Sequence, residues 1–202
     1  MNANQGKKTN VFFLIYIIPL LLNNCTELYH ANIGKHQFPT VHQKEDSLFI
    51  NGLSGKLLYK KLNIALNRKE KITIVVFENV PGSVNDYWNL KAGLLLHNKK
   101  VSTLLTKNST VESGGTDLFL AGKALHIDSH AKIGVHAWWG GKSIVPIELP
   151  KNHKEHQFFL DYYQQIGIDS SFYWFTLRSA SADDMHYMSA EEIEKYFGPK
   201  IK

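Results

Sequence analysis

From residue 47 onward, two patterns of hydrophobic and polar positions alternate along the chain. Short apolar runs rich in β-branched residues predict strands, and longer segments with apolar residues three or four positions apart predict helices. We expect strands at 47–52, 71–79, 99–106 and 131–138, and helices at 54–69, 84–98 and 113–124. Because strands and helices alternate in this order, the pattern predicts an α/β fold built on a mostly parallel sheet with right-handed crossovers.

The C-terminal third has a more helical pattern. Residues 152–168 place Phe158, Phe159, Tyr162 and Tyr163 on one helical face. This face is expected to serve either as intramolecular core or as a contact between subunits of a homo-oligomer. At 189–198, Ser189 is followed three positions later by Glu192, which is the capping-box pattern of a helix start.

The N-terminal region has the pattern of a targeting segment. A short positive stretch precedes an apolar run at 11–22, and a membrane-spanning helix needs about 20 apolar residues. We therefore expect a signal peptide at 1–24, a linker at 25–46 and a domain at 47–202. Cys25, the single cysteine, follows a leucine by three positions, a spacing that resembles the bacterial lipoprotein cleavage box. The expectation is an exported protein, periplasmic or tethered to the membrane through a lipid on Cys25.

Composition indicates a folded domain, and the distribution of charge argues against one class of function. The chain has 202 residues, 44% of them hydrophobic, which is enough for one domain with a real core. The net charge is +5, but the basic residues are scattered and form no stripe interleaved with aromatic residues. Nucleic-acid binding is therefore not expected.

The segment VESGGTDLFLAG, residues 111–122, contains the main candidate for a catalytic residue. Ser113 precedes two glycines and an apolar run, so it is expected at a helix N-terminus. Backbone N–H groups there favour developing negative charge, and glycine allows a substrate carbonyl to approach them. Serine is also a favoured N-cap, so Ser113 is either a cap or a nucleophile. A nucleophilic serine needs a base, and His136, at the end of a predicted strand, is the best placed candidate.

Four motifs in order resemble the superfamily of the caseinolytic protease proteolytic subunit and crotonase. These are VVFENVPGSV at 75–84, ESGGTDLFLAGK at 112–123, AKIGVHAW at 131–138 and DDMHYMSAEEIEKYFG at 183–198. The resemblance spans about residues 47–197 and implies a Clp/crotonase-like fold. Within this superfamily, the chain resembles exported bacterial proteins described as hydrolases more than it resembles the other members.

The resemblance also implies roles for individual residues. Ser113 corresponds to the nucleophile, His136 to the general base, and Gly82 and Gly114 to the donors of the oxyanion hole. Asp184 is the expected third catalytic member, although the motif places it one position out of register. The family pattern has two glycines where this chain has one, at Gly82.

The expected function is that of a serine hydrolase, a peptidase in preference to an esterase, without cofactor or metal. Its expected partners are a peptide or ester substrate, other copies of the chain in a homo-oligomer, and the membrane. The alternative is a non-catalytic envelope protein that uses the same scaffold for binding or assembly. Trp138 and Trp139 follow His136, and one is expected to line a substrate groove while the other fills the core.

Overall fold

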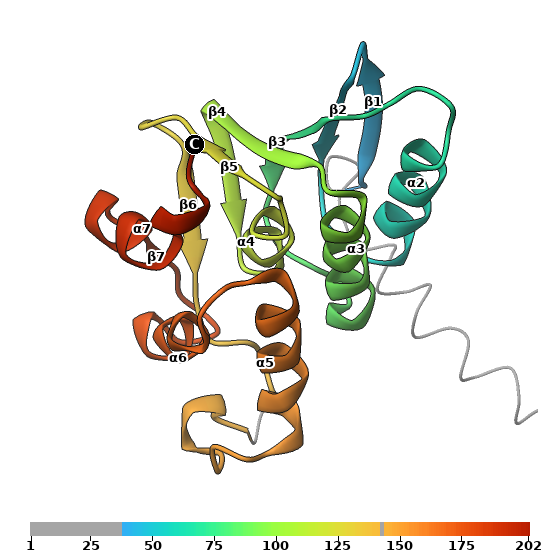
Figure 1. Cartoon of the computed structure of the whole chain (residues 1–202). Coiled ribbons are helices and arrows are strands. Elements are labelled where there is room, and N and C mark those ends of the chain that lie inside the picture. The colour runs from blue at the N-terminus through green and yellow to red at the C-terminus, as the bar shows by residue number, and fades with distance from the viewer. Residues whose placement is uncertain (1–37, 142–143) are drawn as a thin grey trace, which may run out of the picture. The chain divides into compact units, whose positions relative to one another are not determined.

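A mostly parallel, seven-stranded sheet forms the centre of the described part of the chain (Figure 1). The computed structural model describes residues 38–141 and 144–202. The strands are β1 (Thr40–Lys44), β2 (Ser47–Asn51), β3 (Ile74–Val80), β4 (Ser102–Glu112), β5 (Leu125–Ile127), β6 (Lys132–Val135) and β7 (His186–Tyr187). The expected signal peptide and Cys25 lie outside the described residues.

The strand order is β1-β2-β3-β4-β6-β7, and the long strand β4 has two neighbours on one side. Its first half pairs with β5 and its last residues pair with β6, both in parallel. Only the outer pairs, β1 with β2 and β6 with β7, are antiparallel among the described strands. As a result, the carboxyl ends of β3, β4 and β6 meet at one edge of the sheet, which is where sites form in open α/β sheets.

Six α-helices cover or extend this sheet within the described residues: α2 (Lys56–Leu66), α3 (Asp86–Lys99), α4 (Gly114–Phe119), α5 (Lys154–Ile166), α6 (Ser170–Ser179) and α7 (Ala190–Phe197). Short 3-10 helices occur at Pro146–Glu148 and Gly198–Lys200. Helices α5, α6 and α7 follow one another at the C-terminal end of the fold (Figure 1). The predicted α/β class, the mostly parallel sheet and the helical C-terminal third are confirmed.

The aromatic face of α5 belongs to the intramolecular core. Phe159, Tyr162 and Tyr163 are buried, and the Tyr163 ring meets Phe172 of α6 edge-on at 5.5 Å between ring centroids. Phe158 is the exception, because it remains 38% exposed. The predicted capping box of α7 is present, with both reciprocal hydrogen bonds between Ser189 and Glu192.

Some elements differ from the pattern-based expectation. Residues 40–44, which the sequence pattern left in a linker, form the edge strand β1, and the short strands β5 and β7 were not predicted. Short edge strands carry too few positions for a clear periodicity. Helix α2 begins at Lys56 and not at residue 54, where the pattern predicted its start. Ser54 is fully buried, and its backbone pairs with the loop that follows β3.

Candidate active site

Ser113 forms the sharp turn between β4 and α4. Strand β4 ends at Glu112, α4 begins at Gly114, and Ser113 between them has φ 52° and ψ −127°. A serine with positive φ is uncommon, and such backbone strain concentrates at functional sites. The turn is anchored by the Ser113 N–H, which donates to the Gly134 carbonyl at 3.0 Å. The Ser113 side chain makes no capping hydrogen bond to α4, so the simple cap interpretation does not describe it.

The two glycines after Ser113 allow the turn to pack against the rest of the site. A β-carbon on Gly115 would lie 2.0 Å from the Val80 carbonyl oxygen, and one on Gly114 would lie 2.6 Å from the Ser83 β-carbon. Gly115 therefore allows close approach of two backbone segments, and Gly114 allows close approach of the Ser83 side chain. The Gly114 carbonyl accepts a hydrogen bond at 2.9 Å from Nδ2 of the buried Asn89 side chain.

Gly82 lies against Ser113 from the loop that follows β3. It has φ 146°, a conformation that favours glycine, and a β-carbon there would lie 4.0 Å from the Ser113 hydroxyl oxygen. Two backbone hydrogen bonds hold this loop: the Ser54 N–H donates to the Gly82 carbonyl at 2.8 Å, and the Val84 N–H donates to the Ser54 carbonyl at 2.9 Å. Gly82 is thus fixed in place by a neighbouring segment rather than by its own loop alone.

The backbone N–H groups of Gly82 and Gly114 are the candidate oxyanion donors. Neither donates a backbone hydrogen bond to any other described residue. Gly114 is the first residue of α4, where an N–H has no partner within the helix. Because both glycines adjoin Ser113, their N–H groups are available to a carbonyl oxygen whose carbon is attacked by the serine.

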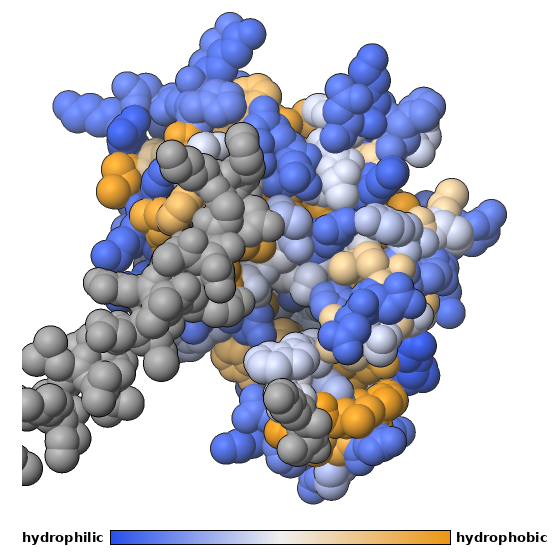
Figure 2. Space-filling view, turned by 180° about the vertical axis from the view of Figure 1, so that it is seen from behind, coloured by the Kyte–Doolittle hydropathy of each residue, from blue (hydrophilic) through white to orange (hydrophobic). Residues whose placement is uncertain are grey.

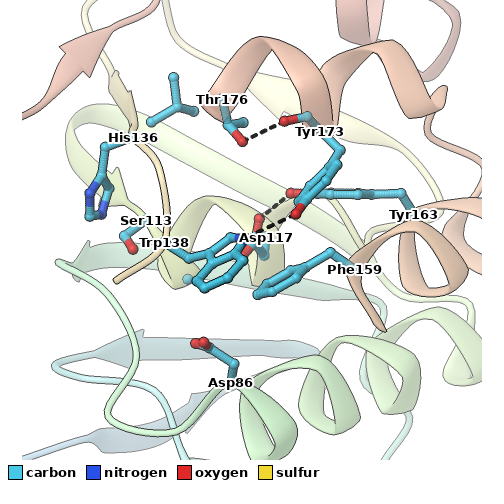
Figure 3. A pocket seen from close by; sticks show the side chains of 11 residues that line it. Asp86, Ser113, Asp117, His136, Trp138, Phe159, Tyr163, Tyr173 and Thr176 are labelled. Carbon is cyan, nitrogen blue, oxygen red and sulfur yellow. Dashed lines mark hydrogen bonds between the residues drawn. The ribbon is translucent and has the colours of Figure 1, made fainter. Parts of the chain in front are cut away.

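His136 follows β6 and lines the same pocket as Ser113. In Figure 3 its ring points toward the Ser113 side chain. No hydrogen bond joins the two side chains, and catalytic hydrogen bonds are often long before substrate binds. The His136 Nδ1 is buried and has no hydrogen-bond partner among the described residues. The structure therefore brings the predicted nucleophile and base together but does not provide an orienting group for the base.

No hydrogen bond joins Asp184 to His136. It lies in an exposed loop before β7, and its carboxylate accepts a hydrogen bond at 2.8 Å from the N–H of Met185, the next residue. Asp183, the neighbouring carboxylate, is also exposed. Neither lines the pocket that contains Ser113 and His136. The third catalytic role that the resemblance assigned to Asp184 is not supported by its position.

A different carboxylate lines the pocket, and the sequence interpretation missed it. Asp117 lies on α4 one helical turn after Ser113, and it accepts a hydrogen bond from the Tyr163 hydroxyl. Burial raises the pKa of the Asp117 carboxyl to about 7, the hydrogen bond from Tyr163 opposes the rise, and the charge of Asp86 adds to it. The available signal was an acidic residue at the start of an apolar run, which is unusual for a buried helix.

Aromatic side chains form the opposite wall of the pocket, which encloses about 410 Å³, part of it open to solvent. Trp138 stacks on Phe159 at 6.3 Å between ring centroids, and Phe159 stacks on Tyr173 at 5.7 Å. The Trp138 indole N–H donates to the Tyr173 hydroxyl at 2.9 Å. Trp138 thus matches the expected groove residue. Trp139 is 71% exposed, so it does not take the core role that was expected of one of the two tryptophans.

Two further features bear on cofactors and membranes. Within residues 38–141 and 144–202, no group of three or more histidine, cysteine, aspartate or glutamate side chains is arranged to hold a metal ion. In the same part of the chain, no helix combines the length and apolar character required to cross a bilayer.

No protein-family model and no curated protein matches the chain. Solved structures similar to it include a mutant of the 1510-N membrane-bound stomatin-specific protease, with 16% identity, a TM-score of 0.48, and coverage of 74% of this chain and 73% of that chain. Methylmalonyl CoA decarboxylase has 12% identity, a TM-score of 0.49, and coverage of 80% and 65%. A probable enoyl-CoA hydratase/isomerase from Mycobacterium abscessus has 12% identity, a TM-score of 0.45, and coverage of 79% and 66%.

All three TM-scores lie below 0.5 and all three identities lie below 25%, so these similarities carry no argument about the fold or the activity of this chain. By their names, the three structures also have different activities.

Proposed function

We propose that the chain is a serine hydrolase that cleaves peptide or ester bonds, with Ser113 as nucleophile and His136 as general base. The observation that carries the proposal is the backbone of Ser113. A serine at φ 52° and ψ −127°, between a parallel strand and a helix, turns its hydroxyl away from the capping position. A strained strand-to-helix turn of this kind also exposes the nucleophile of other serine hydrolases.

The proposed reaction follows from the neighbours of that hydroxyl. The Ser113 Oγ attacks the acyl carbon while the His136 imidazole takes its proton. The carbonyl oxygen becomes an oxyanion and accepts hydrogen bonds from the N–H groups of Gly82 and Gly114. His136 then returns the proton to the leaving group, and water releases the acyl group from Ser113 by the same steps in reverse.

The free Nδ1 of His136 favours a two-residue arrangement over a triad. With Asp184 engaged by its own backbone neighbour, the imidazole has no carboxylate to fix its tautomer. Loss of an orienting aspartate lowers the rate by about 10⁴-fold in a well-studied serine protease. We therefore propose slow turnover of unactivated amides and faster turnover of activated esters.

The same observation favours a second function, that of a non-catalytic binding module on this scaffold. A histidine without an orienting partner is a poor base, and a protein that only binds has no need to keep it activated. Export, membrane tethering and homo-oligomer formation remain predictions from the sequence and are independent of which function holds.

Hydrolysis of p-nitrophenyl acetate by the full-length protein tests the proposal. We expect a burst of p-nitrophenol equal to the protein concentration, followed by slower steady turnover. The burst should be absent in Ser113→Ala and at least about 100-fold slower in His136→Ala. Ser129→Ala and His130→Ala, which change an exposed serine and an exposed histidine, are the matched controls. A wild-type protein that is folded and shows no burst would favour the binding module.

A further inference from the structure

The mechanism proposed above leaves one buried carboxylate in the pocket without a role. Asp117 is on the same face of α4 as Ser113, because residues four positions apart are neighbours on a helix. The helical hydrogen bond from the Asp117 N–H to the Ser113 carbonyl, 3.2 Å long, fixes this relation. One turn of helix is about 5.4 Å, so the carboxylate lies within reach of a group attached to the scissile carbonyl.

The hydrogen bonds of Asp117 are incomplete. Its Oδ1 accepts from the Tyr163 hydroxyl, while the Tyr162 hydroxyl donates to the Asp117 backbone carbonyl at 2.7 Å. Its Oδ2 accepts no hydrogen bond from any described residue, and the side chain lines the pocket (Figure 3). The Oδ2 atom is not fully buried, so a donor or a cation that enters the pocket can reach it.

The remaining walls favour a cation as that missing partner. Trp138, Phe159 and Tyr173 contribute aromatic rings, and Asp86 adds a second carboxylate. Aromatic faces attract ammonium and guanidinium groups, more strongly when water is excluded. No lysine or arginine is among the described residues that line the pocket. The pocket therefore contains negative and aromatic groups without a positive charge to balance them.

The direction of the proposed reaction decides which part of the substrate meets Asp117. The leaving group must lie near His136, because that imidazole protonates it. In Figure 3 the His136 ring lies to the left of Ser113 and the Asp117 side chain lies to its right. The acyl part of the substrate, on the far side of the scissile bond from the leaving group, therefore extends toward Asp117.

From this geometry we propose that Asp117 is a specificity-determining residue that selects substrates with a cationic group, ammonium or guanidinium, on the acyl side of the scissile bond. The proposal rests on the proposed hydrolase function, and it names the substrate class of that site. A bound cation would supply the donor that Oδ2 lacks and would favour the ionised carboxylate, which burial alone disfavours.

Two pairs of p-nitrophenyl esters test the proposal on the full-length protein. The Nα-acetyl-lysine and Nα-acetyl-norleucine esters differ by a side-chain ammonium, and the norleucine esters with and without the acetyl group differ by an α-ammonium. We expect kcat/KM to favour the cationic member of one pair by about tenfold or more at pH 8, since a hydrogen-bonded charge of this kind is typically worth that factor. The pair that responds tells which cation is bound.

The variant Asp117→Asn should remove this preference, so that the two members of the responding pair are hydrolysed with equal kcat/KM. Asparagine keeps the oxygen that accepts from Tyr163, so the fold should survive, and circular dichroism and thermal unfolding report whether it has. Asp161→Asn, which changes an exposed carboxylate on α5, is the matched control. Equal kcat/KM within both pairs in wild type overturns the proposal, as does a preference that persists in Asp117→Asn.

A binding measurement separates this inference from the hydrolase proposal. Nα-acetyl-lysine methylamide and its norleucine analogue are titrated calorimetrically into Ser113→Ala and into the Ser113→Ala, Asp117→Asn double variant. Selective binding of the lysine compound, lost in the double variant, supports the cation site even if wild type hydrolyses no ester. If the wild type hydrolyses esters without a preference in either ester pair and neither compound binds selectively, the hydrolase proposal stands and the cation site is refuted.

Discussion

Gly82 and Ser113 face each other across the site: a β-carbon on Gly82 would lie 3.6 Å from the β-carbon of Ser113. The two residues come from different loops, one after β3 and one after β4. The parallel pairing of these strands, with Val80 opposite Val111, brings both loops to the same edge of the sheet. The candidate oxyanion donors and the candidate nucleophile are therefore positioned by sheet topology and not by local sequence.

The strain at Ser113 gives a stability prediction that is independent of any substrate. Ser113→Gly and Ser113→Ala both remove the hydroxyl, but only glycine relaxes the positive φ. We expect the glycine variant to be more stable than the alanine variant by about 1 kcal/mol, or about 2–4 °C in Tm for a chain of this size. Thermal unfolding followed by circular dichroism measures the difference. If alanine proves equally stable or better, the strained turn is not present in solution.

The contact between Gly115 and Val80 predicts a severe effect on folding. In Gly115→Ala the new β-carbon would lie 2.0 Å from a backbone oxygen, and a backbone segment cannot move aside cheaply. We expect a loss of about 3 kcal/mol or more, or no soluble protein. The control is Gly167→Ala at the end of α5, where φ is 74° and no atom lies within 4 Å. That variant should lose only about 1 kcal/mol in urea unfolding.

Asn89 is predicted to stabilise the turn that carries Ser113, through its hydrogen bond to the Gly114 carbonyl. Removing its side chain in Asn89→Ala leaves the Gly114 carbonyl without its buried donor, at a cost of about 1–3 kcal/mol. The first turn of α4 should loosen, so the ester burst should slow. Asn85→Ala, which removes the N-cap of α3, should cost about 1 kcal/mol in stability with a much smaller effect on the burst. Equal effects of the two variants on the burst would contradict this role.

The raised pKa of Asp117 predicts how stability depends on pH. In the unfolded chain this carboxyl ionises near its ordinary value of 3.8, whereas in the folded chain it keeps its proton up to about pH 7. The stability that it contributes is thus present at low pH and is lost as pH rises between these values, on the order of 4 kcal/mol in total. From about pH 5 to about pH 8, wild type should lose more stability than Asp117→Asn. If wild type and Asp117→Asn lose the same stability over this pH range, the pKa of Asp117 is not raised in the folded chain.

The sequence was sufficient for the alternating order of the inner strands and helices, and for the positions of Ser113 and His136 at the ends of two strands. The β-branched run around Val75 and the apolar spacing of the helices carry that information locally. The sequence could not reveal the positive φ of Ser113, because a favoured capping residue and a strained nucleophile look alike in one dimension. It also could not place Asp184, because the position of an exposed loop carboxylate depends on how β7 pairs with β6.

Asp117 shows a second limit of prediction from the sequence. Its segment was interpreted as a buried helix, and that was correct for Leu118 and Phe119. A single acidic residue in such a run was treated as part of the helix and not as a feature of the pocket. Its partner Tyr163 is far away in the sequence, on α5, so only the packing of α4 against α5 brings the two together.

Fluorophosphonate labelling of the full-length protein is the most direct test of the central claim that Ser113 is an activated nucleophile. The rate is followed by intact-protein mass spectrometry, and the modified residue is located by peptide mapping. The account predicts a single phosphonate adduct on Ser113, no adduct in Ser113→Ala, much slower labelling in His136→Ala, and an unchanged rate in His130→Ala. A folded wild-type protein that stays unmodified, or an adduct on any other serine, would contradict it.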